Sequence, residues 1–363
     1  MREGEELSDW LLFMGLDLRP AMSRSLLEAL GSPRGVLQAS QAELLAIGGV
    51  SAEMATKIRQ GPDRKHLTGW MDYAERNGVF VVPYDSPFFP PLLNEIPDPP
   101  TALLARGDQA ALTGDAVAMV GTRHPSPYGR IVADRMAREL SRAGLTVVSG
   151  GAVGIDTASH QGACVDGRTV AVLGCGLDVP YPPGNQDLFD AVCRHGAVIS
   201  EYPLGARPDT WRFPARNRII SGMSLATIVV EAARKSGALI TAGYAGQQGR
   251  EVMAVPGLVD SPRSRGCHAL IRDGATLIEN ADQVLESLGR STLLDLETNG
   301  RVDPVDVPLD QGLILLALKE GQKHLDDLIN ECRLPAAQTG AALTMLEMRG
   351  LVKRIPGNHY TRL

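Results

Sequence analysis

The feature of this sequence that most restricts its fold is a series of short apolar runs that alternate with helical patterns. Strands that alternate with helices form βαβ units, which build a parallel sheet with right-handed crossovers. Six runs follow this rule: Ala116–Val120, Thr146–Ser149, Val170–Leu173, Ala197–Ser200, Thr227–Val230 and Val252–Val255. A further strand-like piece, Ala275–Ile278, precedes a helical pattern at Ala281–Leu288. We therefore predict an α/β fold with a doubly wound, mostly parallel sheet over residues 79–290.

The segments on either side of this region predict smaller domains, as expected for 363 residues. Residues 1–78 show short helices at Trp10–Met14, Met22–Leu30 and Leu37–Leu45. A helix, a glycine hairpin and a second helix lie between residues 44 and 58 and resemble a helix-hairpin-helix unit, although plain helical packing also explains them.

Prolines and polar residues mark the connections between these parts. Residues 79–115 are a proline-rich connection in which Val79–Pro83 predicts an edge strand. Residues 291–310 are polar and predict a linker. Residues 311–363 predict helices at Ile314–Lys319, Leu325–Cys332 and Ala336–Met348, followed by two strands around a turn at Pro356–Asn358. This is the pattern of a small winged helix.

Charge and cysteine content exclude several classes of protein. The net charge of −6 is spread evenly along the chain, so nucleic-acid binding requires a local basic cluster. The five cysteines are odd in number and form no C-x-x-C pair, so we expect neither a metal nor a disulfide framework, and a reduced, cytoplasmic protein without cofactor. We expect no signal peptide and no membrane segment, since no apolar run reaches about 18 residues.

Two glycine-containing turns predict a phosphate site. Gly121, Thr122 and Arg123 follow the first strand of the sheet, and Ser149, Gly150 and Gly151 follow the second. Ligands of open parallel sheets bind beyond the carboxyl ends of the strands, at the topological switch point. Backbone N–H groups, a hydroxyl and a guanidinium suit a phosphate there. The alternative is that these turns only connect strand to helix.

The most basic segment interleaves aromatic rings with arginines. It contains Trp211, Arg212, Phe213, Arg216, Asn217 and Arg218. Single-stranded nucleic acid is held by base–aromatic stacking beside a positive track. The alternative is that the rings are core residues and the arginines pair with acids such as Glu201 or Glu231.

Signatures of catalysis are incomplete. G-x-G-x-x-G is absent after the first strand, and G-x-x-x-x-G-K-[ST] does not occur. Asp156 and His160 share a predicted helix face, where orienting the glycine loop is a simpler role than catalysis. Cys175 reads as a buried thiol. Tyr181 lies in a rigid turn that Asn185 would close by capping a helix, and stacking of Tyr181 on a base is the alternative.

A short helix near the end of the sheet carries an apolar set. His268, Leu270 and Ile271 lie on it, and Leu277 follows in the last strand-like piece. From the sequence, these residues can either form an exposed patch that binds a partner or be buried within the domain.

Together these motifs resemble the DNA processing protein A (DprA/Smf) family. The resembling motifs cover residues 120–277: Val-Gly-Thr-Arg at 120–123, Ser-Gly-Gly-Ala-Val-Gly-Ile-Asp at 149–156, Gly-Cys-Gly-Leu-Asp at 174–178, Ser-Glu-Tyr-Pro at 200–203, Phe-Pro-Ala-Arg-Asn-Arg-Ile-Ile at 213–220, Ser-Gly-Ala-Leu-Ile-Thr-Ala at 236–242, Gly-Arg-Glu-Val at 249–252 and Ala-Val-Pro-Gly at 254–257. The helical start and the winged-helix-like end match the architecture of many members.

The resemblance implies an extended Rossmann-like core that binds single-stranded DNA without hydrolysing it. It further implies loading of the RecA recombinase during natural transformation, a homodimer, and single-strand-binding protein as another partner. Arg123 and the segment Arg216–Arg218 are then phosphate contacts. His268, Leu270, Ile271 and Leu277 fall in the dimer patch, which is also implicated in meeting RecA.

Some positions depart from the family pattern. Thr122 replaces the usual serine and keeps the hydroxyl, whereas Pro183 stands where some members carry lysine. The predicted recognition helix that begins near Pro335 has no basic residue in its first turn, so packing or a partner contact competes with DNA binding there.

Two rival functions remain at the level of sequence. One is a Rossmann-like hydrolase of the nucleoside monophosphate phosphoribohydrolase type, whose Pro-Gly-Gly-x-Gly-Thr motif is missing, with Glu231 as the only tempting acid. The other is a scaffold that works through its terminal domains alone.

Overall fold

The apolar runs form the strands of one nine-stranded sheet, so the predicted α/β class is confirmed. The strand order is β1-β2-β6-β5-β4-β3-β7-β8-β9. The strands from β6 to β9 in this order are parallel, and β1 and β2 extend the sheet in antiparallel pairing. Their bounds are β1 Val79–Pro83, β2 Ala102–Gly107, β3 Ala116–Val120, β4 Thr146–Ser149, β5 Thr169–Leu173, β6 Gly196–Ser200, β7 Ala226–Val229, β8 Glu251–Ala254 and β9 Thr276–Leu277.

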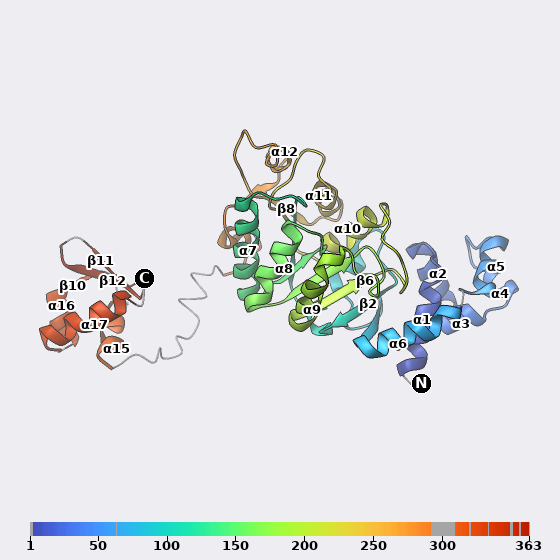
Figure 1. Cartoon of the computed structure of the whole chain (residues 1–363), viewed down its shortest axis with the longest axis horizontal. Coiled ribbons are helices and arrows are strands. Elements are labelled where there is room, and N and C mark those ends of the chain that lie inside the picture. The colour runs from blue at the N-terminus through green and yellow to red at the C-terminus, as the bar shows by residue number, and fades with distance from the viewer. Residues whose placement is uncertain are drawn as a thin grey trace. The chain divides into compact units, whose positions relative to one another are not determined.

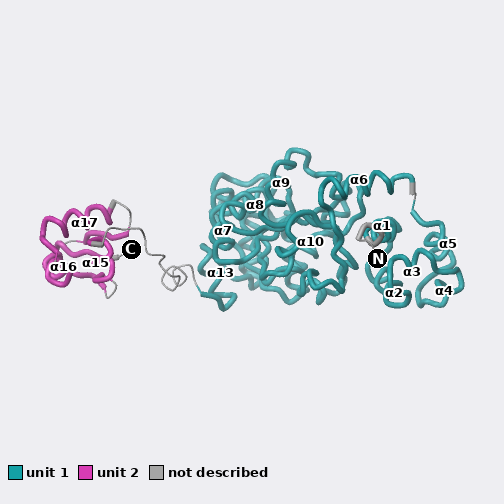
Figure 2. Tube along the Cα trace, turned by 90° about the horizontal axis from the view of Figure 1, so that it is seen from below, with its two compact units in different colours: residues 1–296 teal, residues 297–363 magenta. Residues whose placement is uncertain are grey.

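Two compact units make up the chain, residues 1–296 and residues 297–363 (Figure 2). The structure, a computed structural model, describes residues 3–62, 64–291, 309–318, 321–332, 334–348, 351–355 and 357–362. The predicted linker 291–310 lies mostly outside the described residues. The domain boundaries given above stay predictions.

Strand β2 was not predicted from the sequence. It lies in the segment that we expected to be a proline-rich connection, and it pairs with both β1 and β6. Its first four residues are buried on both faces, so the strand lacks the alternation of apolar and polar residues that marks a half-exposed strand. The predicted edge strand Val79–Pro83 is confirmed as β1.

Helices cover both faces of the sheet because successive strand residues point to opposite sides. In β3, Val117 and Met119 pack toward α7, α8 and α13, whereas Ala116, Ala118 and Val120 pack toward α10, α11 and α12. Helices α7, α8 and α9 lie side by side (Figure 1). The bounds are α7 Pro127–Arg142, α8 Ile155–Asp166, α9 Gln186–His195, α10 Arg212–Gly222, α11 Ala238–Gln247, α12 Arg265–Arg272 and α13 Ala281–Ser287.

The described residues before the sheet form six helices. They are α1 Glu3–Met14, α2 Pro20–Leu30, α3 Pro33–Gln38, α4 Gln41–Leu45, α5 Ala52–Gln60 and α6 Leu67–Asn77. Serine side chains cap the starts of three of them, α3, α4 and α5. The expected single helix Leu37–Leu45 is instead two, because Ser40 forms a capping box with Glu43 and starts α4 afresh. Short 3₁₀ turns complete the unit: η1 Arg64–His66, η2 Pro91–Glu95, η3 Gln109–Leu112 and η4 Pro183–Asn185.

The second unit has the three helices and the strand pair that its sequence predicts. They are α15 Leu309–Ala317, α16 Leu325–Cys332, α17 Ala336–Met348, β11 Val352–Ile355 and β12 His359–Arg362. A short strand that the sequence did not predict, β10 Lys323–His324, pairs with β12. Pro356 of the predicted turn and Lys319 of the first predicted helix lie outside the described residues. Among the described helices, none combines the length and apolar character that a bilayer crossing needs.

Candidate nucleic-acid interface

The candidate site lies where the sheet changes its winding direction. Strand β3 lies between β4 and β7, so the chain after β3 builds one side of the sheet and the chain after β6 builds the other. The loops that follow β3, β4, β5 and β7 meet at this edge with the first turns of α10 and α11. This is the switch-point crevice that the sequence predicts.

A cavity of about 500 Å³ occupies this crevice. Five of the predicted site residues line it: Gly121, Arg123, Phe213, Arg216 and Asn217. Thr122, Ser149, Gly150, Gly151, Arg212 and Arg218 do not line it. Residues that the sequence analysis did not assign to the site complete the wall, including Asp156, Tyr181 and the start of α11 at Ser236–Ala238.

Arg123 is the exposed cation of this cavity. Its guanidinium carbon lies 5.7 Å from the ring centroid of Phe213, within range of a cation–π contact. Phe213 in turn lies beside Tyr181, with ring centroids 5.3 Å apart. Within the described residues, the Arg123 side chain has no ion pair closer than 4.0 Å and no hydrogen bond. The cavity therefore offers a guanidinium and two aromatic faces to a ligand.

Arg216 is the buried cation of the same cavity, only 5% exposed. Its Nη1 donates to the carbonyl oxygens of Gly150, at 2.8 Å, and of Val172. Its Nε has no hydrogen-bond partner among the described residues. Burial lowers the pKa of this guanidinium, and the nearby Asp156 carboxylate opposes that shift. Two carbonyls from neighbouring strand ends thus hold Arg216 in place.

Asp156 faces Arg216 from the first turn of α8. Burial raises the pKa of its carboxyl group above the ordinary value, and Arg216 partly reverses that rise. One carboxylate oxygen accepts a hydrogen bond from the backbone N–H of Ala152 at 3.3 Å. This contact supports the prediction that Asp156 orients the glycine loop. The sequence feature that could have assigned Asp156 to the site is its position shortly after Gly150 and Gly151.

Glycine is required at two of the predicted positions. A Cβ on Gly150 would lie 2.7 Å from Nη2 of Arg216 and 2.8 Å from Oδ2 of Asp156. A Cβ on Gly121 would lie 2.5 Å from Cγ1 of Ile155. Real Cβ atoms do not approach that closely, so these glycines let the loops after β3 and β4 close around the crevice.

Ser149, Thr122 and Gly151 hold the loops rather than face the cavity. The fully buried Ser149 hydroxyl donates to the carbonyl of Met119 at 2.6 Å and so ties β4 to β3. The Thr122 hydroxyl accepts the N–H of His124 at 3.2 Å. The carbonyl of Gly151 accepts a hydrogen bond from the side chain of Asn185 at 2.9 Å. Asn185 is the N-cap residue of α9, as predicted, but its side chain holds the glycine loop and forms no capping hydrogen bond to the helix.

Arg218 points to the opposite side of α10. Its guanidinium forms a bidentate ion pair with the carboxylate of Glu201 at 3.1 and 2.6 Å, and its Nε donates to Asp98 at 3.3 Å. The Arg218 and Glu201 side chains are only 9% and 12% exposed. Burial raises the pKa of Glu201, and Arg218 opposes that shift. Of the two acids named in the alternative interpretation, Glu201 thus pairs with an arginine.

Glu231 does not pair with either arginine, so that part of the alternative is wrong. Its carboxylate accepts the backbone N–H of Ser126 at 2.8 Å and lies against Gly129, at the start of α7. A carboxylate at a helix N-terminus is favoured by the helix dipole. The side chain of His160 also has a structural contact: its Nδ1 lies 2.7 Å from the Thr169 hydroxyl, and burial lowers the pKa of the imidazole to about 3.

Arg212 contacts two aromatic rings at the start of α10. Its guanidinium carbon lies 4.8 Å from the ring centroid of Tyr202 and 5.2 Å from that of Trp211. Its Nη1 donates to the carbonyl of Arg207 at 3.1 Å. Cys175, as predicted, is buried at a strand end, and burial raises the pKa of its thiol to about 11.

The predicted partner patch lies at the far edge of the sheet. His268, Leu270 and Ile271 are half-buried on α12, and Leu277 on the edge strand β9 is 46% exposed. The loop between β8 and α12 adds Leu258 and Val259, which are 80% and 78% exposed. The sequence analysis missed these two because a lone apolar pair in a loop carries no periodic signal. Within the described chain, no cluster of three or more metal-ligating acids, histidines or cysteines occurs.

Family models match both parts of the chain. One, described as DNA recombination-mediator protein A, matches residues 80–289, and a second, described as DprA winged helix domain, matches residues 303–358. Protein Smf of Synechocystis sp. is 39% identical over 80% of this chain and 82% of its own length. DNA processing protein DprA of Bacillus subtilis is 43% identical over 58% of this chain and 72% of its own.

Two solved structures have similar folds. The X-ray structure of DNA processing protein A from Streptococcus pneumoniae aligns with a TM-score of 0.66 and 33% identity, over 79% of this chain and 98% of that one. A structure addressing the single-stranded DNA binding mode of DNA processing protein A from Helicobacter pylori aligns with a TM-score of 0.53 and 30% identity, over 58% of this chain and 95% of that one.

Proposed function

This chain belongs to the DNA recombination-mediator protein A family, and from that premise we propose that it binds single-stranded DNA as a recombination mediator in natural transformation. Its Helicobacter pylori relative is described by a single-stranded DNA binding mode. The observation that carries the proposal is Arg123: an exposed guanidinium, unpaired among the described residues, beside aromatic rings at the mouth of a cavity.

In this proposal the cavity residues contact the strand directly. Gly121, Arg123, Arg216 and Asn217 face the sugar-phosphate backbone, and Phe213 stacks on a base. Thr122, Ser149, Gly150 and Gly151 shape the loops that present them. Arg212 faces the strand beside the rings of Tyr202 and Trp211, whereas Arg218 acts mainly by fixing α10 through Glu201.

We propose that the protein binds the strand and does not break it. Three side chains considered for catalysis, Asp156, Glu231 and His160, are each engaged in a structural hydrogen bond. The function takes place in the cytoplasm. We further propose that the protein loads RecA, that two copies pair through α12 and β9, and that it contacts single-strand-binding protein. The family and the exposed apolar residues near α12 and β9 support these proposals.

A gel-shift titration with single- and double-stranded oligonucleotides of equal sequence tests the proposal. We expect tighter binding of the single strand and a fall of affinity with salt, since phosphate contacts release counterions. Residues 79–290 alone should retain binding. Equal affinity for both forms, absence of binding at moderate salt, or release of free base from nucleotides would overturn the proposal.

A further inference from the structure

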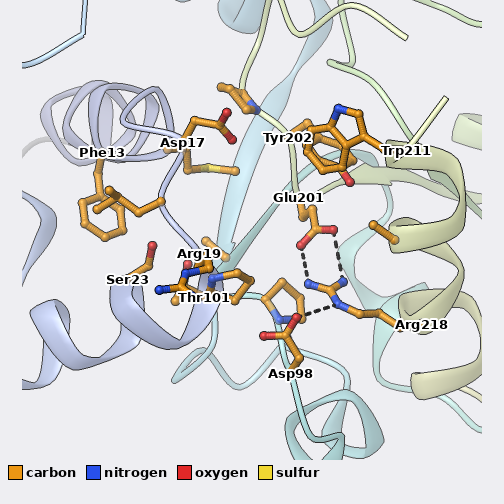
Figure 3. A pocket seen from close by; sticks show the side chains of 17 residues that line it. Phe13, Asp17, Arg19, Ser23, Asp98, Thr101, Glu201, Tyr202, Trp211 and Arg218 are labelled. Carbon is orange, nitrogen blue, oxygen red and sulfur yellow. Dashed lines mark hydrogen bonds and ion pairs between the residues drawn. The ribbon is translucent and has the colours of Figure 1, made fainter. Parts of the chain in front are cut away.

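A second cavity lies on the opposite side of α10 from the switch-point crevice, which we call the Arg123 crevice after the exposed cation that lines it. It has a volume of about 320 Å³. Its walls come from the loop between α1 and α2, from the segment before β2, and from the residues after β6 (Figure 3). We call it the Trp211 cavity, because the indole of Trp211 forms its aromatic wall. Trp211 belongs to the aromatic and basic segment that the sequence associates with base stacking, and the proposed function above gives this cavity no role.

Trp211 is a large apolar side chain with 52% of its surface exposed. The ring of Tyr202 meets it edge-on, with centroids 6.2 Å apart and planes at 89°, and the guanidinium of Arg212 lies over it. The indole is therefore held in one orientation by its neighbours while half of it faces solvent. A fixed and exposed ring of this kind is a stacking platform for a flat ligand.

The charges around the Trp211 cavity favour a base over a phosphate. Glu201 and Asp98 lie at its floor, where both contact Arg218, and Asp17 and Arg19 belong to the wall formed by the loop after α1 (Figure 3). Arg218 balances one of the two carboxylates on the floor, so one uncompensated negative charge remains there and disfavours a phosphate. Carboxylate oxygens accept hydrogen bonds from the amino groups of bases. The cavity therefore suits the polar edge of a nucleobase whose ring lies on the indole.

The two cavities are continuous along the chain. Thr210 lines the Arg123 crevice, and the next residue, Trp211, lines the second cavity. The helix that separates them is about 10 Å thick with its side chains. Arg212 follows Trp211 directly, and its guanidinium carbon lies 5.2 Å from the centroid of the indole. A strand that reaches the indole thus meets a cation beside the ring.

We propose that the Trp211 cavity takes an unpaired nucleobase of the same strand whose backbone lies against Arg123. This inference rests on the proposed function. It adds to it a base subsite that is built partly by the helical segment before the sheet. That segment then acts as one wall of the nucleic-acid path.

The intrinsic fluorescence of Trp211 tests the inference on the full chain. The sequence has three tryptophans, of which Trp10 is buried at 5% exposure. A dye-labelled single-stranded oligonucleotide reports binding by anisotropy, and the unlabelled oligonucleotide reports stacking by quenching. We expect saturation to quench the parent protein, and Trp211→Phe to abolish most of that quenching while binding stays close to that of the parent. Trp70→Phe is the matched control and should keep the quenching.

Trp211→Ala removes the ring and should weaken binding about tenfold, within the range for one base–aromatic contact. If the strand binds but the quenching persists in Trp211→Phe, or if Trp211→Ala binds as tightly as the parent, the inference is wrong and the proposed function stands. If anisotropy never rises, even at low salt, the proposed function fails and the inference falls with it.

Discussion

The guanidinium of Arg216 packs directly against Gly150, which has no side chain. Its Nη1 donates to the carbonyl of Gly150 at 2.8 Å, and its Nη2 would lie only 2.7 Å from a Cβ on Gly150. The glycine after β4 and the arginine on α10 are 66 residues apart in sequence. The geometry of the crevice depends on this pair, because any side chain at position 150 must displace Arg216.

The first prediction concerns that contact. Gly150→Ala should weaken single-strand binding at least tenfold and destabilise the fold by about 1–3 kcal/mol, the usual cost of overpacking. Anisotropy and urea unfolding measure the two effects. The matched control is Gly243→Ala on α11, where an added Cβ meets no atom within 4 Å. That change should stabilise the helix by up to about 1 kcal/mol and leave binding unchanged. Normal binding by Gly150→Ala would contradict the prediction.

The second prediction concerns the exposed cation. Arg123→Ala should reduce affinity strongly and lower the free energy of unfolding by no more than about 1 kcal/mol, since its guanidinium loses a cation–π contact with Phe213 but no ion pair among the described residues. The slope of log affinity against log salt should fall by about 0.7 for each lost phosphate contact with a single strand. Arg142→Ala removes an exposed charge at the other end of α7 and serves as control. If both variants behave alike, bulk charge rather than the crevice governs binding.

The third prediction concerns the buried ion pair of Arg218 and Glu201. Arg218→Gln leaves a nearly buried carboxylate without its partner, and such losses cost about 3–5 kcal/mol. Adding Glu201→Gln to that variant should recover part of the loss, because the unpaired charge is then removed. Chemical unfolding of the two single variants and the double variant completes a thermodynamic cycle. Additive losses would mean that the two residues do not stabilise each other.

Much of the fold could be read from the sequence because the parallel strands are buried on both faces. Such strands are continuous apolar runs, and six of them were located within one residue of their observed ends. Strand β2 was missed although its first four residues form an apolar run, because Pro99 and Pro100 stand just before it and prolines indicate a connection. The break before α4 was missed because a serine cap within an apolar helical pattern overrides the periodicity.

The candidate site could be predicted only in part. Glycines and a guanidinium directly after two parallel strands indicate the crevice, since strand ends of one direction meet at one edge. The sequence does not show which face of α10 each arginine occupies. Arg216 and Arg218 are two residues apart and therefore point to different sides of the helix, one to the glycine loop and the other to Glu201.

The fourth prediction is a pH dependence that comes from Asp156. Burial raises the pKa of this carboxyl above its ordinary 3.8, so the folded state holds the proton more tightly than the unfolded state does. Its contribution to stability is fully present below pH 3.8 and is lost as pH rises through the raised pKa. The stability of Asp156→Asn relative to the parent should therefore increase as pH rises from 3.8 through the raised pKa. Urea unfolding across that range measures it, and a constant difference would refute the prediction.

The fifth prediction concerns the edge of the sheet at β9. Leu277→Glu places a charge on an exposed apolar residue of the proposed contact between two copies. We expect this variant to be monomeric in light scattering at concentrations where the parent is dimeric, with an unchanged melting temperature of the monomer. Leu313→Glu, on the similarly exposed Leu313 of α15, is the control and should leave the parent's assembly intact. A parent that is monomeric throughout would refute the pairing.

Because β2 pairs with β6, the parallel part of the sheet is not an independent module. A fragment that starts just before β3 would strip β6 of its neighbour and leave a row of backbone donors and acceptors open to solvent. Open rows of this kind recruit strands from other molecules, and the product is aggregate. The antiparallel strands β1 and β2, which precede the parallel strands in the sequence, thus protect the edge of β6 from pairing with other molecules.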